Sequence, residues 1–146
     1  MSDEPRPTRS GIGRVLIAVY AILALASLGR SGYQIATKFD EAPLAYSLSA
    51  LAAVVYVLAT VALIARGVTW FTVAVVAIGF ELAGVLIVGT LSIIDPALFP
   101  DDTVWSQFGR GYAFIPLVLP ILGLLWLRRV ARARSADAAG SSEAAA

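Results

Sequence analysis

Four long apolar runs occupy most of this chain, and no other feature constrains its fold as strongly. They cover residues 15–36, 44–65, 68–94 and 112–127. Each is about as long as the roughly 17 to 25 residues that a helix needs to cross a hydrocarbon core of roughly 30 Å. Unpaired backbone groups are not tolerated in lipid, and the runs are too long and too evenly apolar for barrel strands. All four are therefore predicted to be helices, which indicates an all-α membrane protein.

The connections and the composition support this class. Residues 38–43 and 66–67 are too short to join anything but antiparallel neighbours, so the sequence predicts an antiparallel up-and-down four-helix transmembrane bundle. Hydrophobic residues make up 59 % of the chain and charged residues only 14 %, where a soluble domain has about 25 % charged residues. The predicted location is the bacterial plasma membrane, as a multi-pass protein.

The basic residues predict the orientation of this bundle. If both termini are cytoplasmic, eight basic side chains lie inside and two outside. The inner set is Arg6, Arg9, Arg14, Arg66, Arg128, Arg129, Arg132 and Arg134, and the outer set is Lys38 and Arg110. Cytoplasmic loops of membrane proteins are enriched in Lys and Arg, so this bias favours cytoplasmic termini.

The polar ends of the chain are predicted to lie outside the membrane domain. Residues 1–10 and 135–146 have little apolar surface to bury, so we expect two disordered cytoplasmic tails around a transmembrane domain of residues 11–134. One alternative threading remains open. "VLIAVYAILALAS" resembles a secretory signal, with Ala24 and Ala26 placed before a cleavage point at Ser27, and cleavage would leave three spans.

Only one connection is sizeable, "DPALFPDDTVWSQFGRG" at residues 95–111. Pro96 and Pro100 end the third helix, because proline lacks a backbone donor. A short turn after Asp101 or Asp102 would place Trp105 and Phe108 on one face, and such amphipathic aromatic segments usually lie in the membrane interface.

The residue types present exclude most enzyme chemistry. The sequence contains no Cys and no His, so thiol nucleophiles, histidine bases and the usual zinc, copper and haem ligand sets are ruled out. The predicted site therefore includes no catalytic residue, no metal and no cofactor. For an enzyme acting at the outer face, Asp101, Asp102 and Arg110 are the only candidate groups, and loop carboxylates of this kind are ordinarily caps and solvated charges.

Two charged side chains interrupt the apolar runs. Glu81 and Arg30 fall about 20 Å and about 22 Å along helices that enter from the same side, at about 1.5 Å per residue. A charged group at the centre of a membrane helix costs at least about 2.5 to 3.5 kcal/mol. The sequence thus predicts a buried Arg30–Glu81 ion pair between the first and third helices. In the alternative, Arg30 snorkels to the outer headgroups and leaves Glu81 alone.

Polar residues also gather toward the predicted outer leaflet, and Gln34, Tyr33, Ser49 and Tyr46 are candidates to line a polar pocket there. With Arg30 at its floor, such a pocket could take an anionic group. The alternative is that polar side chains simply cost less near an interface.

Three stretches carry a resemblance: "GRSGYQIATKFDEAPLAY" (29–46), "FELAGVLIVGTLS" (80–92) and "WSQFGRGYAFIPLVLPILGLLWL" (105–127). They are similar to stretches of small integral membrane proteins of actinobacteria, a group that implies a membrane fold but no activity. From the sequence we expect a non-catalytic accessory or assembly subunit of a larger membrane complex or a homo-oligomer. The alternative is a small proton-linked transporter or channel using Glu81. The expected partners are the lipid bilayer and other membrane protein, with no nucleic acid.

Overall fold

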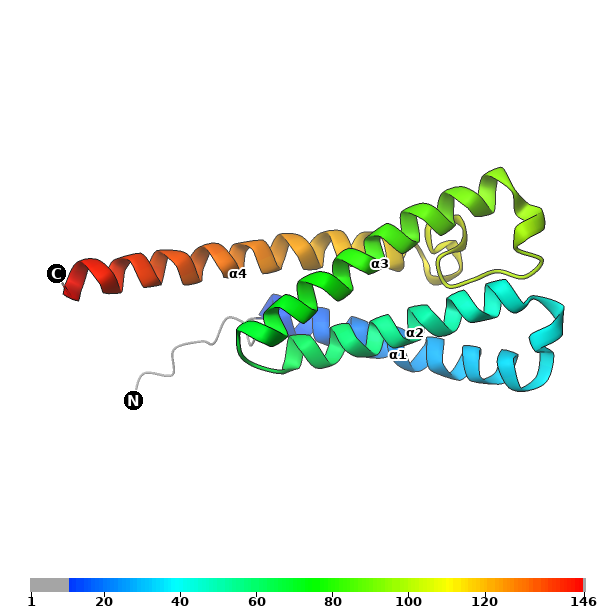
Figure 1. Ribbon diagram of the computed structural model, residues 1–146, viewed down its shortest axis with the longest axis horizontal. Coiled ribbons are helices and arrows are strands. Elements are labelled where there is room, and N and C mark those ends of the chain that lie inside the picture. The colour runs from blue at the N-terminus through cyan, green and yellow to red at the C-terminus, as the bar shows by residue number, and fades with distance from the viewer. Residues whose placement is uncertain (1–10, 146) are drawn as a thin grey trace.

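The computed structural model describes residues 11–145, and within that range every regular element is helical. The four long helices are α1 (Gly11–Lys38), α2 (Pro43–Ile64), α3 (Val68–Ile94) and α4 (Ile115–Ala145). Short 3₁₀ turns are η2 (Phe39–Glu41), η3 (Pro96–Leu98), η4 (Ser106–Phe108) and η5 (Arg110–Tyr112). We call the end that holds η2 and residues 95–114 the loop end, and the opposite end, with Gly11 and the α2–α3 turn, the tail end (Figure 1).

Local sequence explains where these helices begin and end. Pro43 opens α2 at a position where its missing N–H is not needed, and α2 and α3 coincide with the second and third apolar runs to within one residue. Gly67 joins them with φ of 111°, a conformation that favours glycine. At the other end of α3, Pro96 follows Asp95 and prevents the helix from continuing.

Membrane-spanning capacity differs among the helices. Within the described residues, α2, α3 and α1 together with η2 are long and apolar enough to cross a membrane. Residues 106–112 and α4 are long and apolar enough for a fourth span only when they are taken together. The two segments meet at an angle of 99°. The apolar part of α4, residues 115–127, is only about 20 Å long at about 1.5 Å per residue. The chain is therefore a multi-pass membrane protein with three or four spans.

Helix α4 departs from the sequence prediction at both of its ends. It begins at Ile115 and not at 112, because Ala113 and Phe114 have φ of 54° and 60° and so cannot belong to a right-handed helix. It then continues to Ala145, so the predicted disorder of residues 135–146 is wrong for 135–145. Alanine has the highest helix propensity, and this exposed stretch is rich in it; its far end projects beyond the other helices (Figure 1). The predicted N-terminal tail, 1–10, lies outside the described residues.

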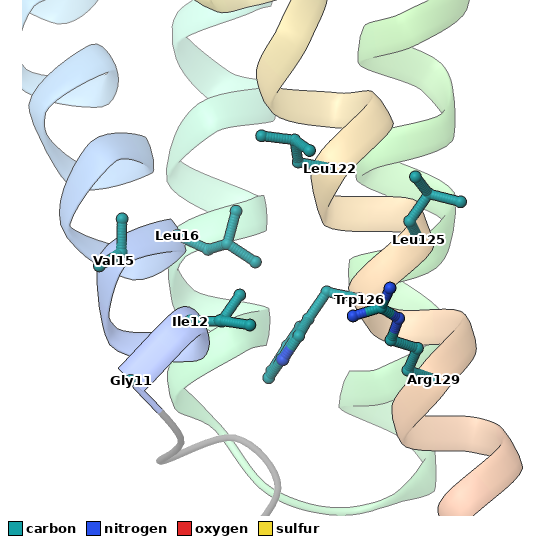
Figure 2. A pocket seen from close by; sticks show the side chains of 8 residues that line it. All are labelled: Gly11, Ile12, Val15, Leu16, Leu122, Leu125, Trp126 and Arg129. Atoms are coloured by element: carbon teal, nitrogen blue, oxygen red, sulfur yellow. The ribbon is translucent and has the colours of Figure 1, made fainter.

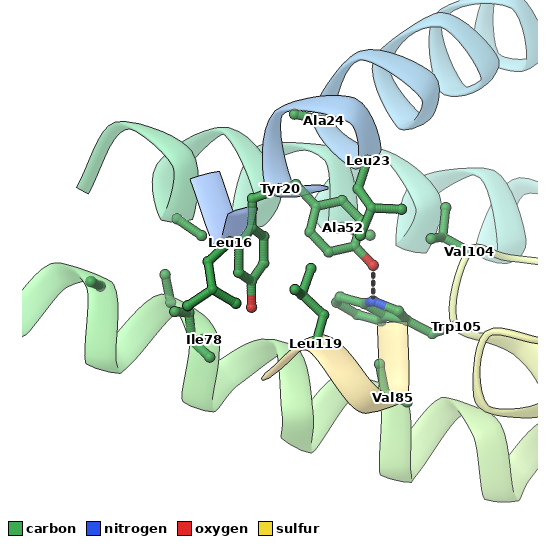
Figure 3. Packing of buried hydrophobic residues seen from close by; sticks show 14 of the residues in the cluster. Leu16, Tyr20, Leu23, Ala24, Ala52, Ile78, Val85, Val104, Trp105 and Leu119 are labelled. Carbon is green, nitrogen blue, oxygen red and sulfur yellow. Dashed lines mark hydrogen bonds between the residues drawn. The ribbon is translucent and has the colours of Figure 1, made fainter. Parts of the chain in front are cut away.

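The core lies between all four long helices, with Leu119 and Leu127 contributed by α4, and is completed by side chains from the loop end. Tyr20, Tyr56, Ile78 and Val85 are fully buried. Trp105 belongs to the long connection, yet it is buried and lies near Leu119 and Val85 (Figure 3). The connection between α3 and α4 thus contributes one of the largest buried side chains of the bundle.

Candidate functional site

Residues 103–114 fold back between the helices, and we call them the inserted segment. Its Trp105 is 1 % exposed and its ring faces Gly84 of α3. Gly84 lies about 15 Å before the end of α3 at about 1.5 Å per residue. Trp105 is therefore a core side chain, and Phe108 is partly buried against α3, because two glycines of α3 leave room for them. The second is Gly89, whose Cα lies against the Phe108 ring.

Hydrogen bonds anchor the inserted segment to α3 and within itself. The Ser106 hydroxyl accepts from the backbone N–H of Thr103 at 2.8 Å, and the Thr103 hydroxyl accepts from that of Trp105 at 3.0 Å. Ser92 of α3 accepts from the backbone N–H of Gln107 at 2.8 Å. These contacts satisfy backbone groups that would otherwise be unpaired inside a membrane protein.

Four fully or almost fully buried side chains form a cluster around Glu81, and we call Tyr20, Tyr56, Glu81 and Trp105 the core polar cluster. The Tyr20 hydroxyl donates to Glu81 Oε2 at 2.7 Å. Trp105 Nε1 donates to the Tyr56 hydroxyl at 3.0 Å, the dashed line in Figure 3, and the two tyrosine rings lie 6.3 Å apart. Glu81 Oε1 is buried without a hydrogen-bond partner among the described residues. The cluster joins α1, α2, α3 and the inserted segment.

The predicted Arg30–Glu81 ion pair is wrong. Glu81 is paired with Tyr20, and the Arg30 guanidinium instead donates to the carbonyl oxygen of Asp102 at 2.9 Å. Tyr20 and Arg30 lie about 15 Å apart along α1, at about 1.5 Å per residue, so Arg30 belongs to a level nearer the loop end. The prediction counted the depth of each residue along its own helix and assumed that both helices start at the same level. It failed because α1 and α3 are offset along their axes. Arg30 thus reaches toward the loop end, where it contacts the connection between α3 and α4 at Asp102, and the snorkelling alternative stays a prediction.

Within residues 11–145, Tyr20 is the only hydrogen-bond donor to the Glu81 carboxylate, which is fully buried, so the Tyr20 hydroxyl should matter for stability. We expect Tyr20→Phe to lower the free energy of unfolding by about 1–3 kcal/mol, the cost of leaving a buried polar group unsatisfied. Thermal or denaturant unfolding in detergent measures this. Tyr33→Phe is the matched control, because Tyr33 is 62 % exposed and should change stability by less than about 0.5 kcal/mol. Equal losses in both variants would contradict the role of the Tyr20–Glu81 bond.

A second polar site lies at the loop end, where Arg30 and the inserted segment enclose a cavity of about 280 Å³ that we call the arginine cavity. Its walls are Arg30, Asp102, Thr103, Ser106, Gln107, Arg110 and Gly111. Arg110 donates to the side-chain oxygen of Gln107 at 3.0 Å. The prediction that Arg30 borders a polar pocket therefore has a structural counterpart, with walls that the sequence did not indicate.

The predicted members of that pocket have other positions. Gln34, Ser49 and Tyr46 are buried, but they lie within the bundle and do not line the arginine cavity. The Tyr46 hydroxyl donates to Asp101 Oδ2 at 2.9 Å. Tyr33 is exposed, because it precedes the buried Gln34 by one residue and so points about 100° away from it around α1. Tyr33 does not line the arginine cavity.

At the tail end, α1 and α4 leave an open groove of about 510 Å³ between them, which we call the α1–α4 groove (Figure 2). Ile12 and Leu16 point toward Trp126 and Leu122 across it, and Arg129 lies at its α4 wall. The walls are otherwise apolar. Its size and apolar walls allow this groove to accept an apolar segment.

Sequence reasoning missed Tyr20 as the partner of Glu81, and it missed the neighbouring bond between Trp105 and Tyr56. The available signal was the pair of tyrosines in apolar runs, since a buried hydroxyl normally finds a hydrogen-bond partner. Gly84 and Gly89 were the signal for close approach of another segment to α3.

Neither a metal site within the described residues nor a known relative identifies the function. No group of three or more His, Cys, Asp or Glu side chains within residues 11–145 has an arrangement that could hold a metal ion. No protein-family model, no curated protein and no solved structure matches the chain.

Proposed function

We propose that this chain is an antiparallel four-span bundle with both termini in the cytoplasm, acting as a non-catalytic accessory subunit of a larger membrane complex. The positions of the basic residues support the orientation. Within the described residues, the tail end carries Arg14, Arg66, Arg128 and Arg129, whereas Arg30, Lys38 and Arg110 lie toward the loop end. The tail end would then face the cytoplasm.

The observation that carries the accessory role is the α1–α4 groove. Two apolar helix faces flank it, and they repeat at helical spacing: Ile12 and Leu16 on α1, Leu122 and Trp126 on α4. Helices associate in membranes through close side-chain packing, so a helix-flanked groove that no residue of 11–145 fills is a suitable binding site for another helix. Arg129 at its wall favours a partner helix with an acidic residue near its cytoplasmic end.

The Glu81-dependent transporter is the weaker alternative. A proton-linked carrier needs its carboxylate to become accessible from the aqueous phases in turn. Glu81 is 0 % exposed, and it is bonded to Tyr20 beside the buried ring of Trp105. This arrangement supports a role for Glu81 in holding the bundle together, and it leaves binding surfaces as the accessible features of the protein.

Site-specific photocrosslinking tests the accessory role. With a photoreactive phenylalanine at position 12 or 122, in the α1–α4 groove, we expect a discrete protein adduct from native membranes. Arg129→Glu should reduce the adduct severalfold if the partner carries an acidic residue there. Gel mobility followed by mass spectrometry identifies the partner.

Positions 22 and 87 are the controls, because Ile22 and Ile87 are exposed on α1 and α3 but lie outside the groove. Equal protein adducts at all four positions, or lipid adducts only, would refute docking in the groove. An adduct of twice the chain's own mass would replace the accessory role by self-association.

A further inference from the structure

We propose that the arginine cavity is a binding site for an oxyanion, a phosphate or carboxylate group held between Arg30 and Arg110. The two residues come from different elements, α1 and the inserted segment, and line the same cavity of about 280 Å³. The sequence analysis did not predict that these two arginines lie close together, because it placed Arg30 in a span and Arg110 in a loop.

Arg30 is a cation without a charged partner. It lies about 12 Å before the end of α1 at about 1.5 Å per residue, at a depth where charged groups in spans are costly and usually functional. A guanidinium has five N–H donors, and within residues 11–145 this one donates only to the neutral carbonyl of Asp102 and forms no salt bridge. An anion in the cavity would use its remaining donors and offset its charge.

Arg110 supplies the second guanidinium. Gln107 holds one of its terminal nitrogens at 3.0 Å, and Arg110 likewise has no salt bridge within the described residues. Its position depends on an unusual backbone: Gln107, Phe108 and Gly109 have φ of 50°, 61° and 82°. Such a cluster of left-handed residues is costly and is typical of segments with a binding role. Planar guanidinium groups bind carboxylate and phosphate oxygens in pairs of parallel hydrogen bonds.

Among the described residues, Asp102 is the one acidic residue that lines the cavity. Its backbone groups are engaged: the carbonyl accepts from Arg30 and the N–H donates to Asp101 Oδ1 at 2.9 Å. Two guanidinium groups face a single carboxylate, so the lining keeps a net positive charge. Because Arg30 contacts the backbone and not the side chain of Asp102, Asp102→Asn removes a repelling charge without removing that contact.

Binding to the purified full-length chain in phosphatidylcholine nanodiscs tests the site. Inorganic phosphate and acetate are titrated as free anions, and in a separate arm phosphatidylglycerol is added to the nanodiscs. We expect saturable binding of an anion, weakened about tenfold or more by Arg30→Gln or Arg110→Gln, since each removes charge-assisted hydrogen bonds. Lys38→Gln, which removes a cation at the same end but outside the cavity, should leave affinity unchanged.

Asp102→Asn should increase affinity severalfold, an effect that a damaged fold cannot produce. Binding of phosphate or acetate identifies a soluble anion, and binding of phosphatidylglycerol alone identifies a lipid headgroup; each supports the site. Absence of saturable binding in both arms, or unchanged binding after both arginine substitutions, would overturn it. The test of this site is independent of the test of the accessory role. The α1–α4 groove lies at the opposite end of the bundle and is probed by crosslinking, whereas the arginine cavity is probed by anion binding.

Discussion

Replacing Trp105 with alanine is expected to lower the free energy of unfolding by about 3–5 kcal/mol, the range for truncating a large aromatic residue in a core. Trp105 is 1 % exposed, packs against α3 at Gly84 and donates a hydrogen bond to Tyr56. Alanine removes the ring contacts, leaves a void between the helices and deprives the Tyr56 hydroxyl of its donor. Thermal unfolding in detergent, followed by circular dichroism, measures the loss.

Trp70→Ala is the matched control. It removes the same side chain from the start of α3, where Trp70 is 38 % exposed, and it should cost much less. Trp105→Phe separates the two contributions: phenylalanine keeps most of the packing but cannot donate, so we expect a loss of about 1–3 kcal/mol from the hydrogen bond and the smaller ring. If Trp105→Ala and Trp70→Ala were equally stable, the inserted segment would not be part of the core.

The second large effect concerns the glycines of α3 that receive the inserted segment. A Cβ at Gly84 would lie 2.6 to 2.9 Å from three ring carbons of Trp105, and one at Gly89 would lie 2.5 Å from Phe108 and 2.9 Å from its backbone nitrogen. These neighbours are a rigid buried ring and main chain, which cannot simply swing away. We expect Gly84→Ala and Gly89→Ala each to cost about 1–3 kcal/mol through overpacking, measured as a fall in unfolding temperature.

Gly79→Ala, on the same helix, provides the comparison. A Cβ there would meet nothing within 4 Å, so the change should be neutral or should stabilise by up to about 1 kcal/mol through helix propensity. Because all three variants share the propensity gain, their differences isolate the contact with the inserted segment. Similar stability in all three would mean that Trp105 and Phe108 do not pack against α3.

The helices themselves were predictable for a local reason. A run of about 20 apolar residues can satisfy its backbone in lipid only as a helix, so the second and third runs define α2 and α3 to within one residue. The fourth span was predicted less well. Its start depends on the left-handed residues Ala113 and Phe114, neither of which is a residue type that signals such a conformation.

The candidate sites were predictable only in part. The sequence singled out Arg30 and Glu81 correctly as costly charges that need partners, and both have them. It paired them with each other, because depth along a helix can be counted but the offset between helices cannot. The partners that the structure reveals, Tyr20 and the Asp102 carbonyl, depend on how α1 packs against α3 and on where the inserted segment lies.

The lengths of the apolar runs determined that this chain is a helical membrane protein, because they follow from local transfer energies. The absence of Cys and His limited its chemistry, because it follows from residue types alone. Only the tertiary structure decided that a loop tryptophan fills the bundle, that Glu81 is bonded to Tyr20, and that Arg30 and Arg110 share a cavity. These features arise from contacts between segments far apart in the chain, whose relative positions are set by packing and not by any single stretch of sequence.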